Sequence, residues 1–148
     1  MTDDELRKFL DQTKTMIICS IGKGGVPHPM PMWFALDDDG AVVMTTFTKS
    51  QKIQNLKRDP RVSLLAEAGE TYSDLRGVVI YGSAEIDTEV ESVFETLRRV
   101  SVRMGTVPAE DTEAVREGLI ASAKKRCLIR VKPDKVVSWD HRKLGGVY

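Results

Sequence analysis

The sequence has 148 residues, 41% of them hydrophobic, and its 22 basic and 22 acidic side chains give a formal net charge of zero. This balance leaves no global positive field to attract nucleic acid, and no run approaches the roughly 20 apolar residues that a membrane-spanning helix needs. The length predicts a single domain over residues 1–148 with its own core. Two cysteines in apolar runs and the absence of a signal-peptide pattern predict a reduced, cytoplasmic protein.

The first third of the chain carries helix, strand and turn signals in close succession. Thr2 and Glu5 form a capping-box pattern before an apolar stripe, which predicts a short first helix. A β-type run at Thr15–Ile21 is followed by a glycine-rich turn and a second strand over Val26–Leu36. With a further strand at Ala41–Phe47, these segments predict an antiparallel meander, because a parallel sheet needs a helix in each connection.

The strand predicted at Val26–Leu36 contains prolines at positions 27, 29 and 31, all on the same side of an extended chain. Proline removes ladder donors, so the segment is expected at a sheet edge or at an opening in a barrel. A flat ligand could rest there on soft apolar or aromatic side chains. The candidates for this surface are Met30, Pro31, Met32, Trp33 and Phe34, although each could equally be core at the rim of a barrel.

The segment Ala41–Glu67 reads as strand, short helix and strand, with the helix opening at Ser50 and ending at Asp59-Pro60. Its first turn has free backbone N–H groups and lies beside Lys49 and Lys52, a combination that suits an anion. Thr45 and Thr46 add two hydroxyls at the end of the preceding strand. The pattern therefore indicates a phosphate site. The alternative is a solvated lysine-bearing helix that only covers a sheet edge.

The second half of the chain predicts a long strand over Gly77–Asp87, a strong amphipathic helix over Glu89–Met104 and a weaker helix from Pro108 to about Lys124. Two strands then follow, Arg126–Lys132 and Lys135–Asp140, joined by a turn at Pro133-Asp134. The fold class is α+β: a small antiparallel β-barrel with peripheral helices.

The sequence lacks the usual catalytic and metal-binding patterns. Its histidines, His28 and His141, have no cysteine or second histidine at ligand spacing, so no metal site is predicted. Cys127 lies in an apolar strand and is read as a buried, inert thiol. The tail Ser138–Gly146 combines Trp139 with cations and glycines, and could place that ring and Arg142 against a planar phosphorylated ligand. A mobile charged terminus is the alternative.

Three stretches carry a family resemblance: KSQKIQNLKRDPRVSLL at 49–65, ETYSDLRGV at 70–78 and SWDHRKLGG at 138–146. With the preceding threonines at 45 and 46, they resemble the pyridoxamine 5′-phosphate oxidase-like family of FMN-binding split barrels. In their individual residues, these stretches are most similar to the actinobacterial branch of that family, which uses the deazaflavin coenzyme F-420. The likeness covers nearly the whole chain and is weakest in the two late helices.

The resemblance implies a homodimer whose subunits form the cofactor site at their interface. The cofactor phosphate would sit on the residues Ser50, Gln51 and Lys52. The ring and ribityl chain would be bordered by the two threonines and by the backbone of Pro29–Phe34, and Trp139 would close the site from the partner subunit. Between the subunits, the helix at 89–104 and the barrel face are expected to bury surface.

Three positions depart from true pyridoxamine phosphate oxidases. Pro29 and Phe34 stand where those enzymes carry an arginine and a lysine, and Gln51 stands where an arginine normally precedes the lysine. Loss of these cations disfavours FMN, whose phosphate is a dianion. A deazaflavin with a phosphodiester and an acidic tail needs charge spread along a groove, which Lys49, Lys52, Lys57 and Arg58 could supply.

The resemblance and these departures together imply an oxidoreductase that binds reduced coenzyme F-420 and passes hydride to an unsaturated organic acceptor. The cofactor carries the redox chemistry, which explains the missing catalytic triad. His141 and Tyr81 are the candidates for a proton donor. The alternatives are an FMN-dependent oxidoreductase or oxidase of the same fold, and a flavin- or deazaflavin-binding protein without turnover. Neither nucleic acid nor a membrane is an expected partner.

Overall fold

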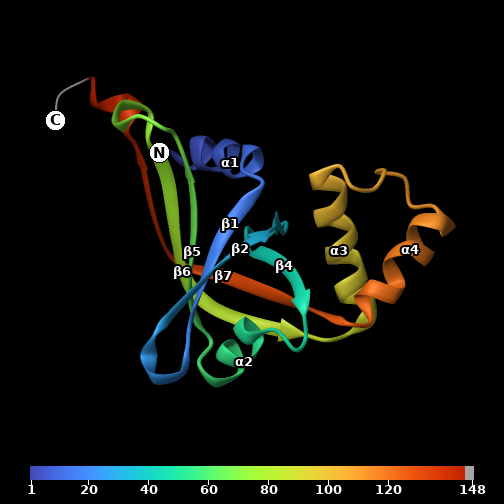
Figure 1. Ribbon diagram of the computed structural model, residues 1–148. Coiled ribbons are helices and arrows are strands. Elements are labelled where there is room, and N and C mark those ends of the chain that lie inside the picture. The colour runs from blue at the N-terminus through green and yellow to red at the C-terminus, as the bar shows by residue number, and fades with distance from the viewer. Residues whose placement is uncertain (146–148) are drawn as a thin grey trace.

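The computed structural model describes residues 1–145, which form an α+β fold built on one seven-stranded antiparallel sheet curled into a half barrel (Figure 1). The strand order is β2-β1-β5-β6-β7-β4-β3, so the proline-rich β2 is at a sheet edge as predicted. The elements are α1 (Asp3–Gln12), β1 (Thr15–Ile21), β2 (Pro27–Trp33), β3 (Ala35–Leu36), β4 (Val42–Phe47), α2 (Gln51–Arg58), β5 (Arg61–Ala68), β6 (Arg76–Asp87), α3 (Val90–Met104), α4 (Glu113–Ala123) and β7 (Arg126–Asp140).

Local capping signals set the helix bounds. Thr2 Oγ1 accepts from the Glu5 amide, and the Glu5 carboxylate accepts from the Thr2 amide at 2.7 Å, which confirms the predicted capping box of α1. The predicted short helix is α2, with Ser50 as its N-cap residue. The weaker late helix, α4, begins later than predicted, because Thr112 caps it by accepting from the Val115 amide.

The predicted antiparallel meander is only partly right: its successive segments pair through β1–β2 and β3–β4, but they do not form one three-stranded unit. β2 pairs with β1, whereas β4 pairs with β3 and β7 and has no ladder with β2. The predicted strand over Val26–Leu36 is in fact two strands, β2 and β3, separated at Phe34. The Phe34 side chain is fully buried, and its carbonyl accepts from Arg103 instead of from a neighbouring strand. The chain therefore turns inward at this residue.

The two predicted C-terminal strands are also wrong as separate elements, since β7 is one continuous strand. Its ladder with β6 shifts register between Tyr81 and Gly82: Tyr81 pairs with Lys135 and Gly82 with Pro133. Asp134 is left between these pairs as a β-bulge. A bulge accommodates a proline within a strand, because the ladder there does not require the missing N–H.

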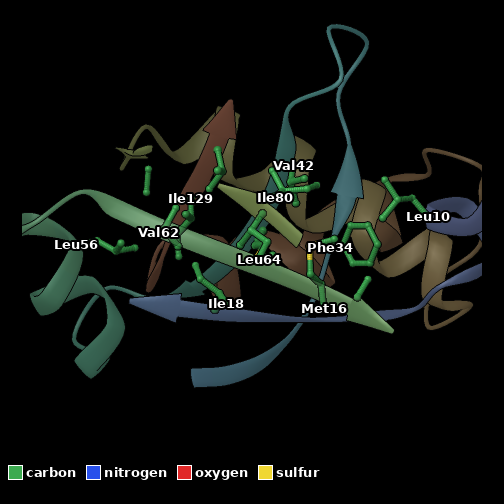
Figure 2. Close-up of a cluster of buried hydrophobic side chains, with 14 of the residues drawn as sticks. Leu10, Met16, Ile18, Phe34, Val42, Leu56, Val62, Leu64, Ile80 and Ile129 are labelled. Atoms are coloured by element: carbon green, nitrogen blue, oxygen red, sulfur yellow. The ribbon is translucent and has the colours of Figure 1, made fainter. Parts of the chain in front are cut away.

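Two apolar clusters lie on either side of β4. Figure 2 shows the larger one inside the half barrel, where Met16, Phe34 and Leu64 are fully buried. The smaller cluster joins β4 to α3 through Val43 and Phe94. Successive side chains of a strand point to opposite faces, so the end of β4 presents one residue toward the barrel and the next toward α3.

The outer face of the sheet carries a row of apolar side chains that no other element within residues 1–145 buries. A row of paired residues crosses five strands of this face, and none of its members is buried: Pro31, Ile17, Leu65, Val79 and Val137. Val137 is 42% exposed and Tyr81 on the adjacent row is 45% exposed. A continuous apolar row of this kind is typical of a protein–protein contact.

Candidate functional site

The sequence groups Thr45 and Thr46 together, but the structure points them in opposite directions. Thr46 pairs with Cys127 and Thr45 with Leu128, and these partners belong to the barrel core and the α3 cluster respectively. Both threonines are nearly buried. Only the Thr46 hydroxyl therefore joins the predicted phosphate pocket, while Thr45 belongs to a groove on the other side of β4.

The side chains of the predicted phosphate site, which we call the phosphate pocket, meet at the start of α2. The Lys52 side chain is 8% exposed, and its Nζ donates to Thr46 Oγ1 at 3.0 Å. The Thr46 hydroxyl in turn donates to Ser50 Oγ at 3.5 Å. Ser50 makes no side-chain cap to its own helix, and the first amides of a helix have no carbonyl partner within it. Ammonium, hydroxyls and free amides therefore converge here.

The charge of Lys52 has no acidic partner. No carboxylate within residues 1–145 forms an ion pair with it. Burial lowers the pKa of Lys52 and outweighs the raising effect of Cys127, and the positive charge of Arg126 makes a smaller contribution in the same direction as burial. A desolvated cation beside another cation is an unfavourable arrangement that an anionic ligand would relieve.

Buried amide contacts hold α2 in place. Asn55 is fully buried and donates from Nδ2 to Ser20 Oγ at 3.0 Å, which ties the helix to β1. Gln51 stands where the family normally carries an arginine. Its Nε2 donates to Asn55 Oδ1 at 2.9 Å, so the Gln51 side chain is held along α2. Arg58 donates to the Ile21 carbonyl at 2.9 Å. Of the four cations predicted to spread charge, Lys49, Lys57 and Arg58 are exposed and form no ion pair among residues 1–145.

A groove of about 380 Å³ opens on the α3 side of β4. It brings Pro31, Met32 and Trp33 of the rim strand to Thr45, as predicted, against Leu97, Val100 and Ser101 of α3 and Arg126 of β7. The Trp33 side chain is 48% exposed and lies at the rim of this groove. Met30 is exposed on the sheet edge and does not line this groove.

Arg126 is a candidate site residue that the sequence reasoning missed. Its guanidinium stacks over Phe47 at 4.3 Å from the ring centroid, and its Nε donates to Ser122 Oγ at 3.0 Å. Burial lowers its pKa. The one signal in the sequence was a basic residue at the first position of an apolar strand, which is also a common way to begin a surface strand.

The tail residues lie at the other end of β7 from the phosphate pocket. Cys127 pairs with Thr46, whereas Trp139, 139 − 127 = 12 positions later, pairs with Gly77. At about 3.3 Å per strand residue this separation is roughly 40 Å along the strand. Figure 1 accordingly shows the end of β7 on the α1 side of the molecule, away from α2. Within this chain the described part of the tail does not meet the Lys52 site.

The tail has local partners instead. Arg142 pairs with Asp140 at 2.5 Å, and Arg142 and Asp140 border a small hollow beside α1. His141 Nδ1 lies 2.9 Å from the Tyr72 carbonyl oxygen. The last residue of the predicted tail motif, Gly146, lies outside the described residues. The other proton-donor candidate, Tyr81, is on the outer sheet face, so neither candidate lies beside Lys52 within this chain.

Two further properties concern metals and membranes. Within residues 1–145, no three histidine, cysteine or acidic side chains converge in a way that could hold a metal ion. Among the same residues, every helix is too short or too polar to cross a bilayer. Cys127 is buried, and burial raises its thiol pKa, as expected for an inert cysteine.

Comparison with solved structures supports the fold. A conserved hypothetical protein of Mycobacterium tuberculosis, Rv2991, is 38% identical, with a TM-score of 0.89 over 100% of this chain and 90% of that chain. An F420 reductase is 21% identical, with a TM-score of 0.68 over 88% of this chain and 94% of the other. A FAD-binding protein from Mesorhizobium loti is 14% identical, with a TM-score of 0.66 over 93% and 92%. The last two show likeness of fold alone.

No curated protein sequence matches the chain. A protein-family comparison matches residues 2–140, which include α2, the rim strand β2 and Trp139. The match spans nearly all described residues and agrees with the curled antiparallel sheet and its peripheral helices. The chain belongs to the pyridoxamine 5′-phosphate oxidase family.

Proposed function

We propose that this protein is an oxidoreductase that binds the reduced deazaflavin coenzyme F-420 and passes hydride to an unsaturated organic acceptor. The observation that carries the proposal is the pocket of Lys52: a nearly buried ammonium with two hydroxyls, a helix start and no described carboxylate partner. Burying an unpaired charge costs several kcal/mol. A pocket that keeps such a charge is suited to an anionic ligand.

The departures from the family pattern favour a deazaflavin over FMN. Phe34 is part of the core, and Gln51 is bonded to its own helix, so neither replaces a missing phosphate-facing cation. One buried lysine suits the single charge of a phosphodiester better than a phosphate dianion. The fold shared with an F420 reductase supports this choice, and the fold shared with a FAD-binding protein keeps a flavin as the alternative.

The residues of the site have distinct roles in this proposal. The bound deazaflavin would supply the hydride. Lys52 and the first turn of α2 would hold its phosphodiester, and Thr46 would orient the ammonium. Met32 and Trp33 would form an apolar wall that excludes water from the reacting ring.

We propose that the protein acts as a homodimer through the uncovered outer face of the sheet. The apolar row from Pro31 to Val137 needs a cover, and a second copy has the same row to offer. Trp139 and Arg142 of one subunit lie far from its own pocket, so they could complete only the pocket of the partner subunit. In a dimer of this kind, dilution to monomer abolishes cofactor binding.

The test is a fluorescence titration of the apoprotein with coenzyme F-420 and, separately, with FMN. The expected result is tighter binding of the deazaflavin, and its loss in Lys52→Met, which keeps the buried stem but removes the charge. Lys124→Met is the matched control, because Lys124 is an exposed ammonium at the end of α4. Preference for FMN, or full affinity in Lys52→Met, would overturn the proposal.

A binding protein without turnover remains the rival of the enzyme. Tight deazaflavin binding with no reduction of any member of a broad acceptor panel would favour this rival. Turnover that disappears in Lys52→Met and persists in Lys124→Met would favour the enzyme.

A further inference from the structure

A second cation lies on the opposite side of β4 from the phosphate pocket. Paired residues of adjacent strands share a face, and the pairs Phe47–Arg126 and Thr45–Leu128 are in register with the α3 cluster. Lys52 reaches Thr46, whose side chain points to the barrel side. Arg126 therefore faces the groove.

The known contacts of Arg126 account for only part of its guanidinium. Phe47 covers one face of the guanidinium plane, and Ser122 accepts from Nε. Neither terminal nitrogen has a hydrogen-bond acceptor among residues 1–145, and no carboxylate in that range pairs with the side chain. The two terminal nitrogens, with four N–H donors in a fixed fork, are therefore free to bind a ligand in the groove that Arg126 lines.

The rest of the groove is mostly apolar, with a few hydroxyl groups and no acidic side chain. Leu97, Val100 and Met32 are apolar, Trp33 offers an aromatic surface at the rim, and only Thr45 and Ser101 add small hydroxyls. None of the lining residues is acidic. A groove with apolar walls and one forked cation favours a flat, partly apolar molecule that carries an oxyanion.

We propose that Arg126 forms a second anion subsite in the groove between β4 and α3, and that this subsite takes the oxyanion of a flat, partly apolar ligand. Resting on the proposed function, the ligand is the hydride acceptor, an unsaturated compound that bears a carboxylate. The other source of the same chemistry is the acidic tail of the coenzyme. Arg126 is then a specificity-determining residue for charged acceptors over neutral ones.

The subsite can be tested in the apoprotein with a matched pair of probes. Trp139→Phe leaves Trp33, at the groove rim, as the single tryptophan. Energy transfer from Trp33 then reports the binding of 8-anilinonaphthalene-1-sulfonate, and of N-phenyl-1-naphthylamine, which has the same rings without the sulfonate. In that background, Arg126→Met is expected to weaken binding of the sulfonate probe about tenfold, which is the loss of affinity expected when one hydrogen bond to a charged group is removed. Binding of the neutral probe is expected to stay unchanged.

Controls separate loss of the charge from loss of the fold. Lys125→Met removes the neighbouring exposed ammonium and is expected to leave both probes unchanged. Arg126→Gln keeps a donor and most of the side-chain volume, and serves if Arg126→Met does not fold. The unaltered chain adds a third measurement: benzoate is expected to displace the sulfonate probe, and benzyl alcohol is not. Unchanged sulfonate binding in the Arg126 variants, or equal weakening of both probes, would overturn the subsite.

A second titration identifies the source of the oxyanion. Arg126→Met is compared with the unaltered chain for binding of coenzyme F-420 and of its ribityl fragment, which lacks the phosphate and the acidic tail. Unchanged coenzyme affinity supports the acceptor assignment, and selective loss of coenzyme affinity would overturn it in favour of the tail. The probe titrations need no cofactor, so a failure of the proposed function leaves their result intact.

Discussion

Lys52→Met is expected to make the apoprotein more stable while it abolishes cofactor binding. Lys52 is nearly buried, has no described acidic partner and keeps one hydrogen bond, to Thr46. An unpaired buried charge costs several kcal/mol, and the hydrogen bond from the ammonium offsets about 1.5–3 kcal/mol of that cost. Methionine fills a similar volume without the charge, so we expect a net gain of about 1 kcal/mol, or roughly 2–4 °C in Tm for a domain of this size.

The pH dependence of stability provides an independent check of the same argument. Burial lowers the pKa of Lys52 below its usual 10.5. The folded protein therefore binds fewer protons than the unfolded chain as the pH rises toward 10.5, and its stability gains from that difference. The unaltered protein should show this alkaline gain, and Lys52→Met should lack it.

The assay is urea denaturation of both apoproteins between neutral pH and pH about 10, with Lys124→Met as the control for a general loss of charge. Thr46→Val tests the hydrogen bond by itself and is expected to destabilise the apoprotein, because it leaves the ammonium without a described partner. If Lys52→Met lowers the free energy of unfolding by more than about 1 kcal/mol, the ammonium stabilises the apoprotein, and the argument for a pocket suited to an anion fails.

Three further predictions concern residues around the site. Arg103 donates to the carbonyls of Leu10, Thr13 and Phe34 at 2.5–2.8 Å and stacks on the Phe34 ring. Arg103→Met should therefore lower the free energy of unfolding by about 2–4 kcal/mol in denaturant melts. A decrease of less than about 0.5 kcal/mol would contradict this prediction. A Cβ at Gly77 would overlap the Trp139 ring, so Gly77→Ala should cost about 1–3 kcal/mol and shift tryptophan emission; unchanged emission would count against it. Hydrogen bonds from Arg142 lower the pKa of Asp140 to about 2. This ion pair should therefore persist until strong acid, and Arg142→Gln should raise that pKa in an NMR titration; an Asp140 that titrates at its ordinary value in the unaltered protein would disprove the pairing.

Local sequence signals were sufficient for the helices near the site and for the edge strand. The capping box of α1 and the bounds of α2, from Ser50 to Asp59-Pro60, depend on residues within a turn or two of one another. The prolines of β2 exclude it from the middle of a sheet wherever the other strands lie. The family resemblance likewise rested on short stretches, at residues 49–65, 70–78 and 138–146.

Long-range pairing decided the remaining features. β4 pairs with β7, which lies some 80 residues later in the sequence, and this pairing places Arg126 in the groove and decides which of the two threonines faces the barrel core and which faces the α3 cluster. The register of β6 with β7 likewise separates Trp139 from Lys52. No pattern within a strand states which distant strand it will join, because many apolar strands can pair with similar energy. The choice is made only when the whole core packs, with Phe34 buried in the half barrel and α3 closed over Val43.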